Sequence, residues 1–439
     1  MAQQQIPSAS FFDSLRYNLV QTLPVYTQGL FTRNKFWVSF WTKLDSDARA
    51  VRHVAHLRRK YGAYVYLSVG GNKTLLVLDH AGVEHVLKNS PGTYASDPDA
   101  KRRGMSHFQP GALTISRGAE WQDRRQFNEA VIGEGLTEDE YSGRFVEIVR
   151  REAESLTARA GRTIVWNDLA EAFDAITLQV IFGTEARDDR TLLTRLRKMM
   201  RESNRVFALG KSRHFDAFYS AVSNYLKSPH ERSLTFLTRQ VPSDEDTRVA
   251  NQIPHWMFAM SETLAANTAR TLALIVAEPL AEKRVREEMA RSDLSTQQGI
   301  DKLKYLEACV QEAMRLWPTT PLLMRKTIEE DSIAGVAVPR GTQVIINNTF
   351  NHRDKETHPF ADRFEPELWL EGEANNYSFN HLSNGPQVCA GKHMALFIAK
   401  AFIAALLDKG RYTLGEPALD TARPLPHMYN YYKIKLLSS

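Results

Sequence analysis

The two cysteines of this 439-residue chain, Cys309 and Cys389, stand in different surroundings. Cys309 lies on an apolar helical stripe with Leu306 and Ala313, so we expect it to be a buried core residue. Cys389 follows Gly and Pro and precedes an apolar helical stretch, which predicts a position near a helix N-terminus. Backbone N–H groups there stabilise a thiolate. Such a thiolate could act as a nucleophile, a redox thiol or a metal ligand.

The residue types around Cys389 narrow these choices. A nucleophile needs a nearby base, and no motif supplies one. With two cysteines, the chain can form neither a disulfide framework nor a zinc site of paired cysteines. An axial haem thiolate needs only one cysteine, and Gly385 and Gly391 leave room for a large flat group. From this segment alone, a haem ligand and an inert loop cysteine both remain open.

A second chemical feature is an acid inside an apolar helix. From residue 253 to residue 277, Glu262 and Arg270 are the only charged residues, which predicts a helix buried along most of its surface. A buried carboxylate is costly without a partner, and such groups are candidates for function. Thr263 follows directly. The simpler alternative is that Thr263 bonds back to a helix carbonyl and Glu262 meets a cation.

The cysteine segment resembles the haem-binding loop of the cytochrome P450 family, whose pattern is F-x-x-G-x-R-x-C-x-G. The corresponding residues are Leu382, Gly385, Gln387, Cys389 and Gly391. Leu382 replaces the Phe, and Gln387 replaces the Arg or His that usually meets a propionate. The resemblance implies that Cys389 ligates the iron of haem b, with Gln387 and Gly391 beside the cofactor. Three further family signatures occur in the family's order.

One of these signatures concerns structural charge. Glu312 and Arg315 match the family's E-x-x-R, and they share a helix face at i and i+3. Arg363 resembles the arginine of the family's P-E-R-F segment. The resemblance implies that Glu312, Arg315 and Arg363 form a buried structural charge cluster. Removing one member of such a cluster would leave the others buried and unpaired.

Another signature is the acid-bearing helix itself. Residues 259–263 resemble the family's A-G-x-[DE]-T, with Met260 in the place of the Gly. The resemblance implies that Glu262 and Thr263 are catalytic and deliver protons during dioxygen activation. It also places Ala259 beside the substrate.

The remaining signature is Trp121 and Arg125, which match the family's W-x-x-x-R. The resemblance implies that both bind a haem propionate, and that Arg325 binds the second one. Because Gln387 is neutral, Arg125 and Arg325 would then carry most of the charge facing the propionates. The alternative is that both are solvated surface arginines.

Substrate contacts are implied only by family geometry. The candidates are Ala259, Leu322 and Leu323, together with residues 97–114 and 199–225. Composition does not identify the substrate.

The resemblance implies a haem-thiolate monooxygenase that hydroxylates or otherwise oxidises a small organic substrate, with secondary metabolites as one expectation. Electrons would come from a separate ferredoxin or flavodoxin type donor with its reductase, because the chain has no flavin or iron–sulfur segment. Arg124 and Lys392 are expected to belong to a docking face for that donor. The alternatives are a peroxide-driven or rearranging haem-thiolate enzyme and a non-enzymatic haem protein. The pair Glu262-Thr263 argues against the peroxide-driven type.

The elements that position these residues are mostly helical. Apolar periodicity predicts helices over residues 253–277, 302–317 and from Cys389 to about 408. Short β-branched runs at 63–67 and 74–78 predict a hairpin, and 333–338 and 342–346 predict further strands. We therefore expect a mainly α fold with small β-sheets (α+β), forming one large cytochrome P450-like domain of residues 1–439 around a buried haem.

Composition fits a globular enzyme. Hydrophobic residues make up 43% and charged residues 24%, and the net charge of +5 is too small to indicate nucleic-acid binding. Residues 1–45 form an N-terminal extension with no secretory signal. Residues 17–32 are uncharged, but polar side chains interrupt them, so we expect a soluble segment rather than a transmembrane one, with an interfacial role left open. We expect a cytoplasmic monomer without stable membrane insertion.

Overall fold

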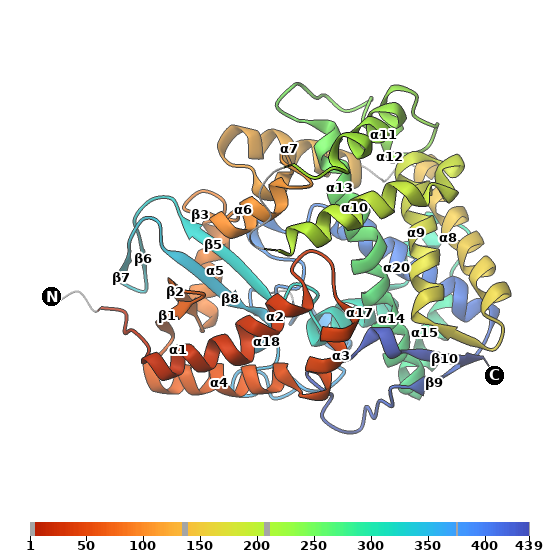
Figure 1. The fold of residues 1–439 in the computed structure, drawn as a ribbon. Helices are drawn as coiled ribbons and strands as arrows, with labels where there is room; N and C mark the ends of the chain where they lie inside the picture. Colours follow the sequence, from red (N-terminus) through yellow and green to blue (C-terminus); the bar gives the residue numbers. More distant parts are fainter. Residues whose placement is uncertain (1–4, 134–138, 206–210, 375, 439) are drawn as a thin grey trace. The chain divides into compact units, whose positions relative to one another are not determined.

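The computed structural model describes residues 5–133, 139–205, 211–374 and 376–438. The chain forms two compact units, each assembled from separate stretches. The first unit contains Met1–Arg103, Met314–Cys389 and Pro424–Tyr429, and the second contains Gly104–Ala313, Ala390–Arg423 and Asn430–Ser439. Helices dominate and the sheets are small (Figure 1), so the mainly α fold with small β-sheets is confirmed. The single domain of residues 1–439 stays a prediction.

The first unit combines the N-terminal helices with most of the strands. Its helical elements are α1 (Phe11–Tyr17), η1 (Asn18–Thr22), α2 (Leu23–Gln28), α3 (Lys35–Lys43), α4 (Ser46–Tyr61), α5 (His80–Lys88), α18 (Asn348–Asn351), α19 (Glu367–Leu370) and η6 (Gly385–Gln387), and α6 (Asp99–Ser106) runs from it into the second unit. Its strands are β1 (Tyr64–Val69), β2 (Asn72–Val77), β3 (Tyr94–Ala95), β5 (Leu322–Thr327), β6 (Asp331–Ile333), β7 (Val336–Val338) and β8 (Gln343–Asn347).

Five of these strands form one sheet in the order β1-β2-β8-β5-β3. Strands β2 and β8 are parallel, and the other neighbours are antiparallel. Both faces of the sheet are covered, because side chains alternate between two hydrophobic clusters along each strand. Leu75 and Val77 face the cluster that includes α5, whereas Leu76 packs with α1, α4 and α18. This double burial explains why 74–78 is a continuous apolar run rather than an alternating one.

The predicted hairpin is confirmed, with Gly70 and Gly71 at positive φ in its turn. The prediction of a single strand over 333–338 is wrong. Ala334 and Gly335 both adopt positive φ, so the segment turns back on itself and forms the hairpin β6–β7. Only Gly adopts that conformation without cost, and Gly335 is the signal that could have revealed the turn.

The second unit is almost entirely helical. Its helical elements are η2 (Leu113–Ile115), α7 (Gly118–Ile132), α8 (Asp139–Ala160), α9 (Trp166–Phe182), η4 (Thr184–Asp188), α10 (Arg190–Ser203), α11 (Phe215–Lys227), α12 (Leu234–Leu237), α13 (Val249–Phe258), η5 (Ala259–Thr263), α14 (Leu264–Ala277), α15 (Pro279–Met289), α16 (Gln297–Asp301), α20 (Lys392–Lys409) and η7 (Tyr431–Lys433). Helix α17 (Lys304–Leu316) runs from this unit into the first. Strands β4 (Thr163–Val165), β10 (Lys435–Ser438) and β9 (Tyr412–Glu416) form a three-stranded sheet in that order.

Two of the apolar helices predicted from the sequence, α14 and α20, form the interior of this unit together with α9. These three helices are buried along most of their length, and α8 packs against both α9 and α20 (Figure 1). Cys309 is fully buried on α17, which confirms its expected place in the core. No helix in the described part of the chain combines the length and the apolar character needed to cross a bilayer.

The predicted charge cluster needs a correction. Glu312 and Arg315 are both fully buried, and the Arg315 guanidinium donates to the backbone carbonyls of His352 (2.8 Å), Ala361 (2.9 Å) and Arg363 (2.9 Å). Arg363 therefore contributes only its carbonyl. Its own side chain is 62% exposed and pairs with Glu365 at 3.1 Å.

A second arginine of the first unit is also buried, and it pairs with a carboxylate. The side chain of Arg353 is 1% exposed, and its Nε donates to Asp362 at 2.8 Å. Its remaining N–H groups donate to the carbonyls of Leu316, Leu425 and Pro426. The prediction chose Arg363 because it lies in the segment that resembles the family's P-E-R-F. Arg353 lies outside that segment, so no motif marks it.

Candidate active site

The cysteine loop, residues 382–389, is closed by its own backbone. The amide of Cys389 donates to the carbonyl of Leu382 at 2.8 Å, and the amide of Val388 donates to Gly385 O at 3.0 Å. Cys389 is exposed, whereas Cys309 is buried. Helix α20 begins three residues later at Lys392, with Gly391 as its N-cap. The chain thus holds one exposed thiol in a tight turn directly before an apolar helix, as predicted.

Gly385 shapes this loop in a way that no other residue could. Its φ is +66°, and a Cβ at this position would lie 2.4 Å from the carbonyl oxygen of Leu87 on α5. Both the positive φ and the close backbone approach exclude side chains. Gly391 has an ordinary backbone, and its Cβ would meet only the Ile132 side chain at 3.4 Å.

Three polar side chains of the first unit gather beside the cysteine loop. Gln387 Nε2 donates to Ser96 Oγ at 3.1 Å, while its Oε1 is buried without a partner. Lys101 Nζ donates to the carbonyl of the same Ser96 at 2.8 Å. Arg325 is buried and donates to Ser90 Oγ at 3.1 Å and Ser383 Oγ at 3.4 Å.

Lys101 and Arg325 are two cations beside the cysteine loop; Arg325 is buried and Lys101 is half-buried, and neither makes an ion pair with a carboxylate of the described residues. Burial and, to a smaller extent, the Arg325 charge lower the pKa of Lys101 to about 7, while Asp97 opposes the change. Burial alone lowers the pKa of Arg325 to about 10. Asp97 is itself bound to Arg102. Because buried charges are costly without a counter-ion, this cluster fits a group that brings a negative charge, such as a haem propionate.

In the second unit, the acid–Thr motif coincides with a local irregularity. Residues 259–263 form the π-helical segment η5 between α13 and α14. Such single π turns occur frequently at functional sites. Glu262 and Thr263 are both partly buried, and Met260, which occupies the family's Gly position, is buried. The hydroxyl of Thr263 makes no hydrogen bond with any residue that the structure describes, so the alternative of a bond back to the helix is wrong.

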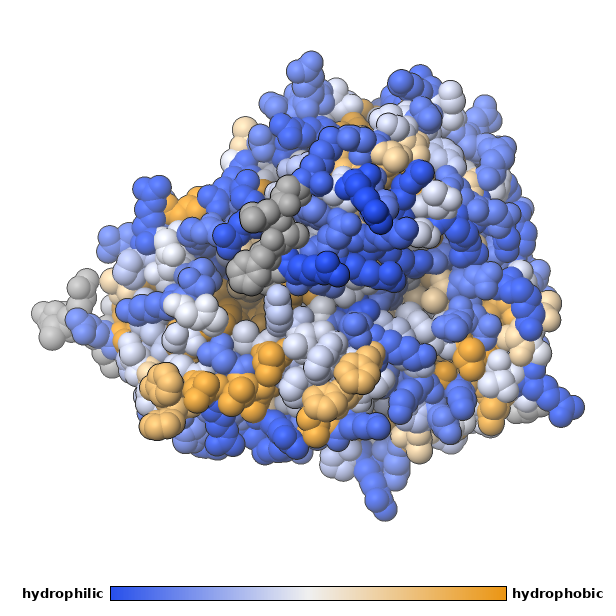
Figure 2. All heavy atoms as spheres, in the orientation of Figure 1, coloured by the Kyte–Doolittle hydropathy of each residue, from blue (hydrophilic) through white to orange (hydrophobic). Residues whose placement is uncertain are grey.

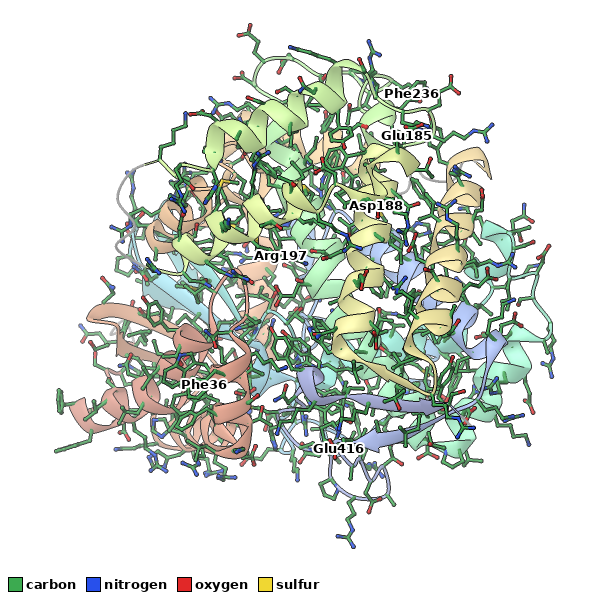
Figure 3. The ribbon with its side chains drawn as sticks, turned by 45° about the vertical axis from the view of Figure 1, so that its right-hand side comes forward. Phe36, Glu185, Asp188, Arg197, Phe236 and Glu416 are labelled. Carbon is green, nitrogen blue, oxygen red and sulfur yellow. The ribbon has the colours of Figure 1, made fainter. Side chains whose placement is uncertain are left out.

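Glu262 is engaged by a side chain from the end of the chain. The phenol of Tyr432 donates to Glu262 Oε1 at 3.1 Å. Burial, Tyr431 and Glu262 all raise the pKa of Tyr432 well above its ordinary value, so the phenol stays protonated and donates. Arg197 of α10, labelled in Figure 3, makes two hydrogen bonds with Asp174 at 2.8 and 2.5 Å, and its charge also interacts with Glu262.

Trp121 and Arg125 lie one turn apart on α7. Arg125 pairs with the exposed Glu129 at 2.5 Å, and Trp121 is partly buried. The expectation that Arg124 belongs to a docking face is wrong. Its side chain is 3% exposed and donates to Ser116 Oγ and to the carbonyl of Asp246. Lys392 is partly exposed at the start of α20, and its docking role stays a prediction.

The substrate candidates are dispersed among elements. Ala259 is partly exposed in η5. Leu323 belongs to the buried cluster on one face of the five-stranded sheet, and Leu322 packs against the cluster on the other. Residues 97–114 include α6, and residues 199–225 include the end of α10 and most of α11, with 206–210 outside the described residues. Their substrate contacts stay predictions.

Sequence reasoning missed two residues that the structure brings to these clusters. Lys101 was expected only as part of the substrate loop, and one lysine between Ala100 and Arg102 carries no distinguishing signal. Tyr432 lies outside all four motifs. Only its place in the aromatic run of residues 429–432 marks it in the sequence.

The comparison with protein families gives a direct match. The family model described as Cytochrome P450 matches residues 32–241 and 236–417. Cytochrome P450 3A6 from Oryctolagus cuniculus is 22% identical over 413 residues, covering 81% of this chain and 80% of the relative. Aromatase 2 from Sus scrofa is 25% identical over 392 residues, covering 80% and 75%.

Shorter matches come from other organisms. Cytochrome P450 4c3 from Drosophila melanogaster is 32% identical over 178 residues. This match covers 38% of the chain and only 33% of the relative's length. Cyclooctat-9-en-7-ol 5-monooxygenase from Streptomyces melanosporofaciens is 30% identical over 173 residues, covering 38% of each chain. Since these relatives come from animals and a bacterium, the bacterial type stays a prediction.

The fold has a close counterpart among solved structures. Cyanobacterial CYP120A1 with bound retinoic acid superposes with a TM-score of 0.72 at 18% identity, covering 88% of this chain and 94% of that one. The family match spans most of the chain, and the cysteine loop and the two cations beside it provide what a thiolate-ligated, dianionic cofactor requires. The chain therefore belongs to the cytochrome P450 family, whose cofactor is haem, iron protoporphyrin IX.

Proposed function

We propose that this chain is a haem-thiolate monooxygenase that inserts oxygen into a small, largely apolar substrate with electrons from a separate protein. The observation that supports this most is Cys389, an exposed thiol at the end of a loop that its own backbone closes, in a chain of the cytochrome P450 family. Bound haem supplies the oxygen-activating chemistry, and the protein supplies binding, orientation and charge.

In the first unit, the residues around the cysteine loop are proposed to bind haem. Cys389 is the metal ligand in this proposal, and its thiolate would donate electron density to the iron. Arg325 and Lys101 would neutralise a propionate, and Gln387 would donate a neutral hydrogen bond in place of the family's Arg. These two cations on one side would compensate for the charge that Gln387 lacks.

In the second unit, Glu262 and Thr263 are proposed to transfer protons. Glu262 can accept and release a proton, and the Tyr432 phenol fixes one of its carboxylate oxygens. Thr263 has a hydroxyl available for a hydrogen bond toward a reacting group. Trp121 and Arg125 of α7 are proposed to bind the other propionate, where Arg125 would exchange its exposed partner Glu129 for the cofactor.

The proposed electron donor is a separate protein, and the proposed substrate class is suggested by the names of the relatives. Two electrons would arrive from a ferredoxin or flavodoxin type donor with its reductase. The Streptomyces relative is named for oxidation of an apolar cyclic alcohol, and the solved counterpart is described with retinoic acid. A small apolar secondary metabolite is accordingly the proposed substrate class, with Ala259 among its contacts.

Turnover under two electron supplies tests this function. The purified holoenzyme is screened with apolar metabolites for substrate-dependent NADPH oxidation in the presence of ferredoxin and ferredoxin reductase. When the reaction is run with isotopically labelled dioxygen, one labelled oxygen atom should appear in the product. Glu262→Gln should reduce the amount of product formed per NADPH consumed. Turnover that needs only hydrogen peroxide, with no label from dioxygen, would overturn the proposal in favour of a peroxide-driven enzyme.

A further inference from the structure

His352 is a fully buried residue whose two ring nitrogens join separate parts of the first unit. It follows α18, and its Nδ1 lies 3.0 Å from the backbone carbonyl oxygen of Arg315, in the last turn of α17. On the other side of the ring, the backbone amide of Asn380 donates to Nε2 at 2.8 Å. A carbonyl can only accept a hydrogen bond and an amide N–H can only donate one. These partners therefore fix the ring as neutral, with its proton on Nδ1.

The α17 end of this bridge is held firmly. The Arg315 guanidinium donates to the backbone carbonyl of His352 at 2.8 Å, so each of the two residues bonds to the backbone of the other. The same guanidinium lies 5.7 Å from the ring centre of Phe360 and 5.5 Å from that of Phe379, within the range of cation–π attraction. Because Arg315 and His352 are both fully buried, neither can exchange these bonds for bonds with water. Helix α17 thus provides a fixed reference point for the imidazole.

Asn380, at the other end of the bridge, is the centre of the turn that leads into the cysteine loop. Its carbonyl accepts from the amide of Ser383 at 2.9 Å and from the side chain of Asn348 at 3.1 Å, and its Oδ1 accepts from Asn384 Nδ2 at 3.0 Å. Asn380 is fully buried, so its own amide depends on His352 for a hydrogen bond.

The turn from Asn380 to Ser383 is strained. Ser383 has a φ of +61°, in the left-handed region that residues with a side chain adopt only at a cost. Such a conformation persists where the surrounding contacts determine it. Within this turn, the carbonyl of Leu382 accepts from the amide of Cys389 at 2.8 Å. A shift of the turn would therefore move the carbonyl to which the backbone of Cys389 is bonded.

We propose that His352 is a positioning residue for Cys389, because its neutral imidazole transmits the fixed position of α17 through Asn380 to the cysteine loop. Without an acceptor at this place, the Asn380 amide would be buried without a partner, and the turn would shift to satisfy it. The inference rests on the proposed ligation of the haem iron by Cys389. It assigns a role to a residue outside all the motifs that the sequence marks.

The surroundings of His352 favour the neutral ring that the bridge requires. Burial, together with His381, the Arg315 charge and His358, lowers the pKa of His352 well below its ordinary value, and the hydrogen bond with the Arg315 carbonyl opposes the change only in part. Protonation would place an N–H on Nε2, facing the N–H of Asn380. The bridge therefore exists only in the neutral form of the ring.

Two substitutions separate the two hydrogen bonds of the ring. In His352→Gln the side-chain amide reaches about as far as Nε2 and can accept from Asn380, whereas in His352→Asn it reaches only about as far as Nδ1 and can donate to Arg315. The readout is the lifetime, in mild urea, of the band near ~450 nm of the reduced protein with carbon monoxide. We expect His352→Asn to shorten this lifetime about tenfold or more, because it leaves a buried amide unpaired, and His352→Gln to shorten it less than about threefold.

Matched measurements separate positioning from general stability. Each of the two variants loses one hydrogen bond, so their thermal midpoints should be similar. His358→Asn alters a half-buried histidine whose ring packs against Phe379 at 4.8 Å, and it should leave the lifetime unchanged. Equal lifetimes of His352→Asn and His352→Gln, with the wild-type band present, would overturn the inference while the ligation by Cys389 stands. A wild type without the band would overturn both.

Isotopic nitrogen labelling of histidine tests the bridge in the wild type even if His352→Asn does not fold. In the diamagnetic carbon monoxide complex at pH ~7, the His352 resonances are identified by their absence from His352→Gln. They should show a neutral ring that is protonated at Nδ1. A ring protonated at Nε2, or at both nitrogens, would overturn the inference.

Discussion

Replacing Lys101 with Met tests the cation cluster beside the cysteine loop, with opposite outcomes expected for the haem-free and haem-bound protein. Burial and Arg325 lower the pKa of Lys101 from 10.5 to about 7. The difference corresponds to about 5 kcal/mol against the charged form. Between pH ~7 and pH ~10.5 the unfolded chain binds more protons at Lys101 than the folded chain does. The free energy of unfolding therefore rises with pH across that range.

Lys101→Met removes this cost from the haem-free protein. We expect its free energy of unfolding at pH ~7 to exceed that of the wild type by up to about 4 kcal/mol, with the gain vanishing as the pH approaches ~10.5. In the haem-bound protein a propionate would compensate the ammonium, and the same variant should lose haem at least tenfold faster. The first quantity is measured by urea unfolding at several pH values, and the second by transfer of haem to an acceptor protein.

Lys88→Met is the matched control. Lys88 is exposed and pairs with Glu84 on α5, so its removal should change stability by less than about 1 kcal/mol and leave haem transfer unchanged. A haem-free Lys101→Met that is less stable than wild type at neutral pH, together with unchanged haem transfer, would refute the reasoning.

Three further predictions follow from the other clusters. Tyr432→Phe should reduce product formed per NADPH consumed several-fold with little change in thermal midpoint, while Tyr141→Phe, which removes a buried phenol from α8, should leave this ratio unchanged. Arg353→Ala should lower the free energy of unfolding by about 3–5 kcal/mol in denaturant titrations, because it leaves the carbonyls of Leu316 and Leu425 without their donor and removes the buried cation from Asp362. Arg363→Ala should cost less than about 1 kcal/mol, and equal costs would contradict the corrected cluster. Gly385→Ala should reduce haem content, measured as haem absorbance per protein, whereas Gly70→Ala, which has a similar φ of +55° but open space, should not.

The parts of the molecule with short-range signals could be predicted from the sequence. The Gly70-Gly71 hairpin and the apolar helices ending before Pro279 and Pro318 depend on local turn chemistry and periodicity, and the structure confirms them. The place of Cys389 before α20 also follows from neighbouring residues.

Features that depend on tertiary contacts were missed or misplaced. Arg353 and Tyr432 have partners far away in sequence, and no local pattern records these contacts. Arg353 donates to the carbonyl of Leu425, 72 residues away, and Tyr432 donates to Glu262, 170 residues away. The π turn at η5 differs from an α-helix by one inserted residue, which periodicity does not resolve. The exposure of the leucines and phenylalanines of α1 and α2 (Figure 2) could not be predicted, because their periodicity is that of any amphipathic helix and only the structure shows which side is buried.

The most direct test of the central claim, that Cys389 is the haem ligand, is the absorbance of the reduced protein with carbon monoxide. Thiolate ligation predicts a band near ~450 nm in the wild type. Cys309→Ser should keep this band, because Cys309 is a buried core residue, and Cys389→Ser should lose it while the protein stays folded. A band near ~420 nm in well-folded wild type, or a band near ~450 nm that survives Cys389→Ser, would contradict the assignment.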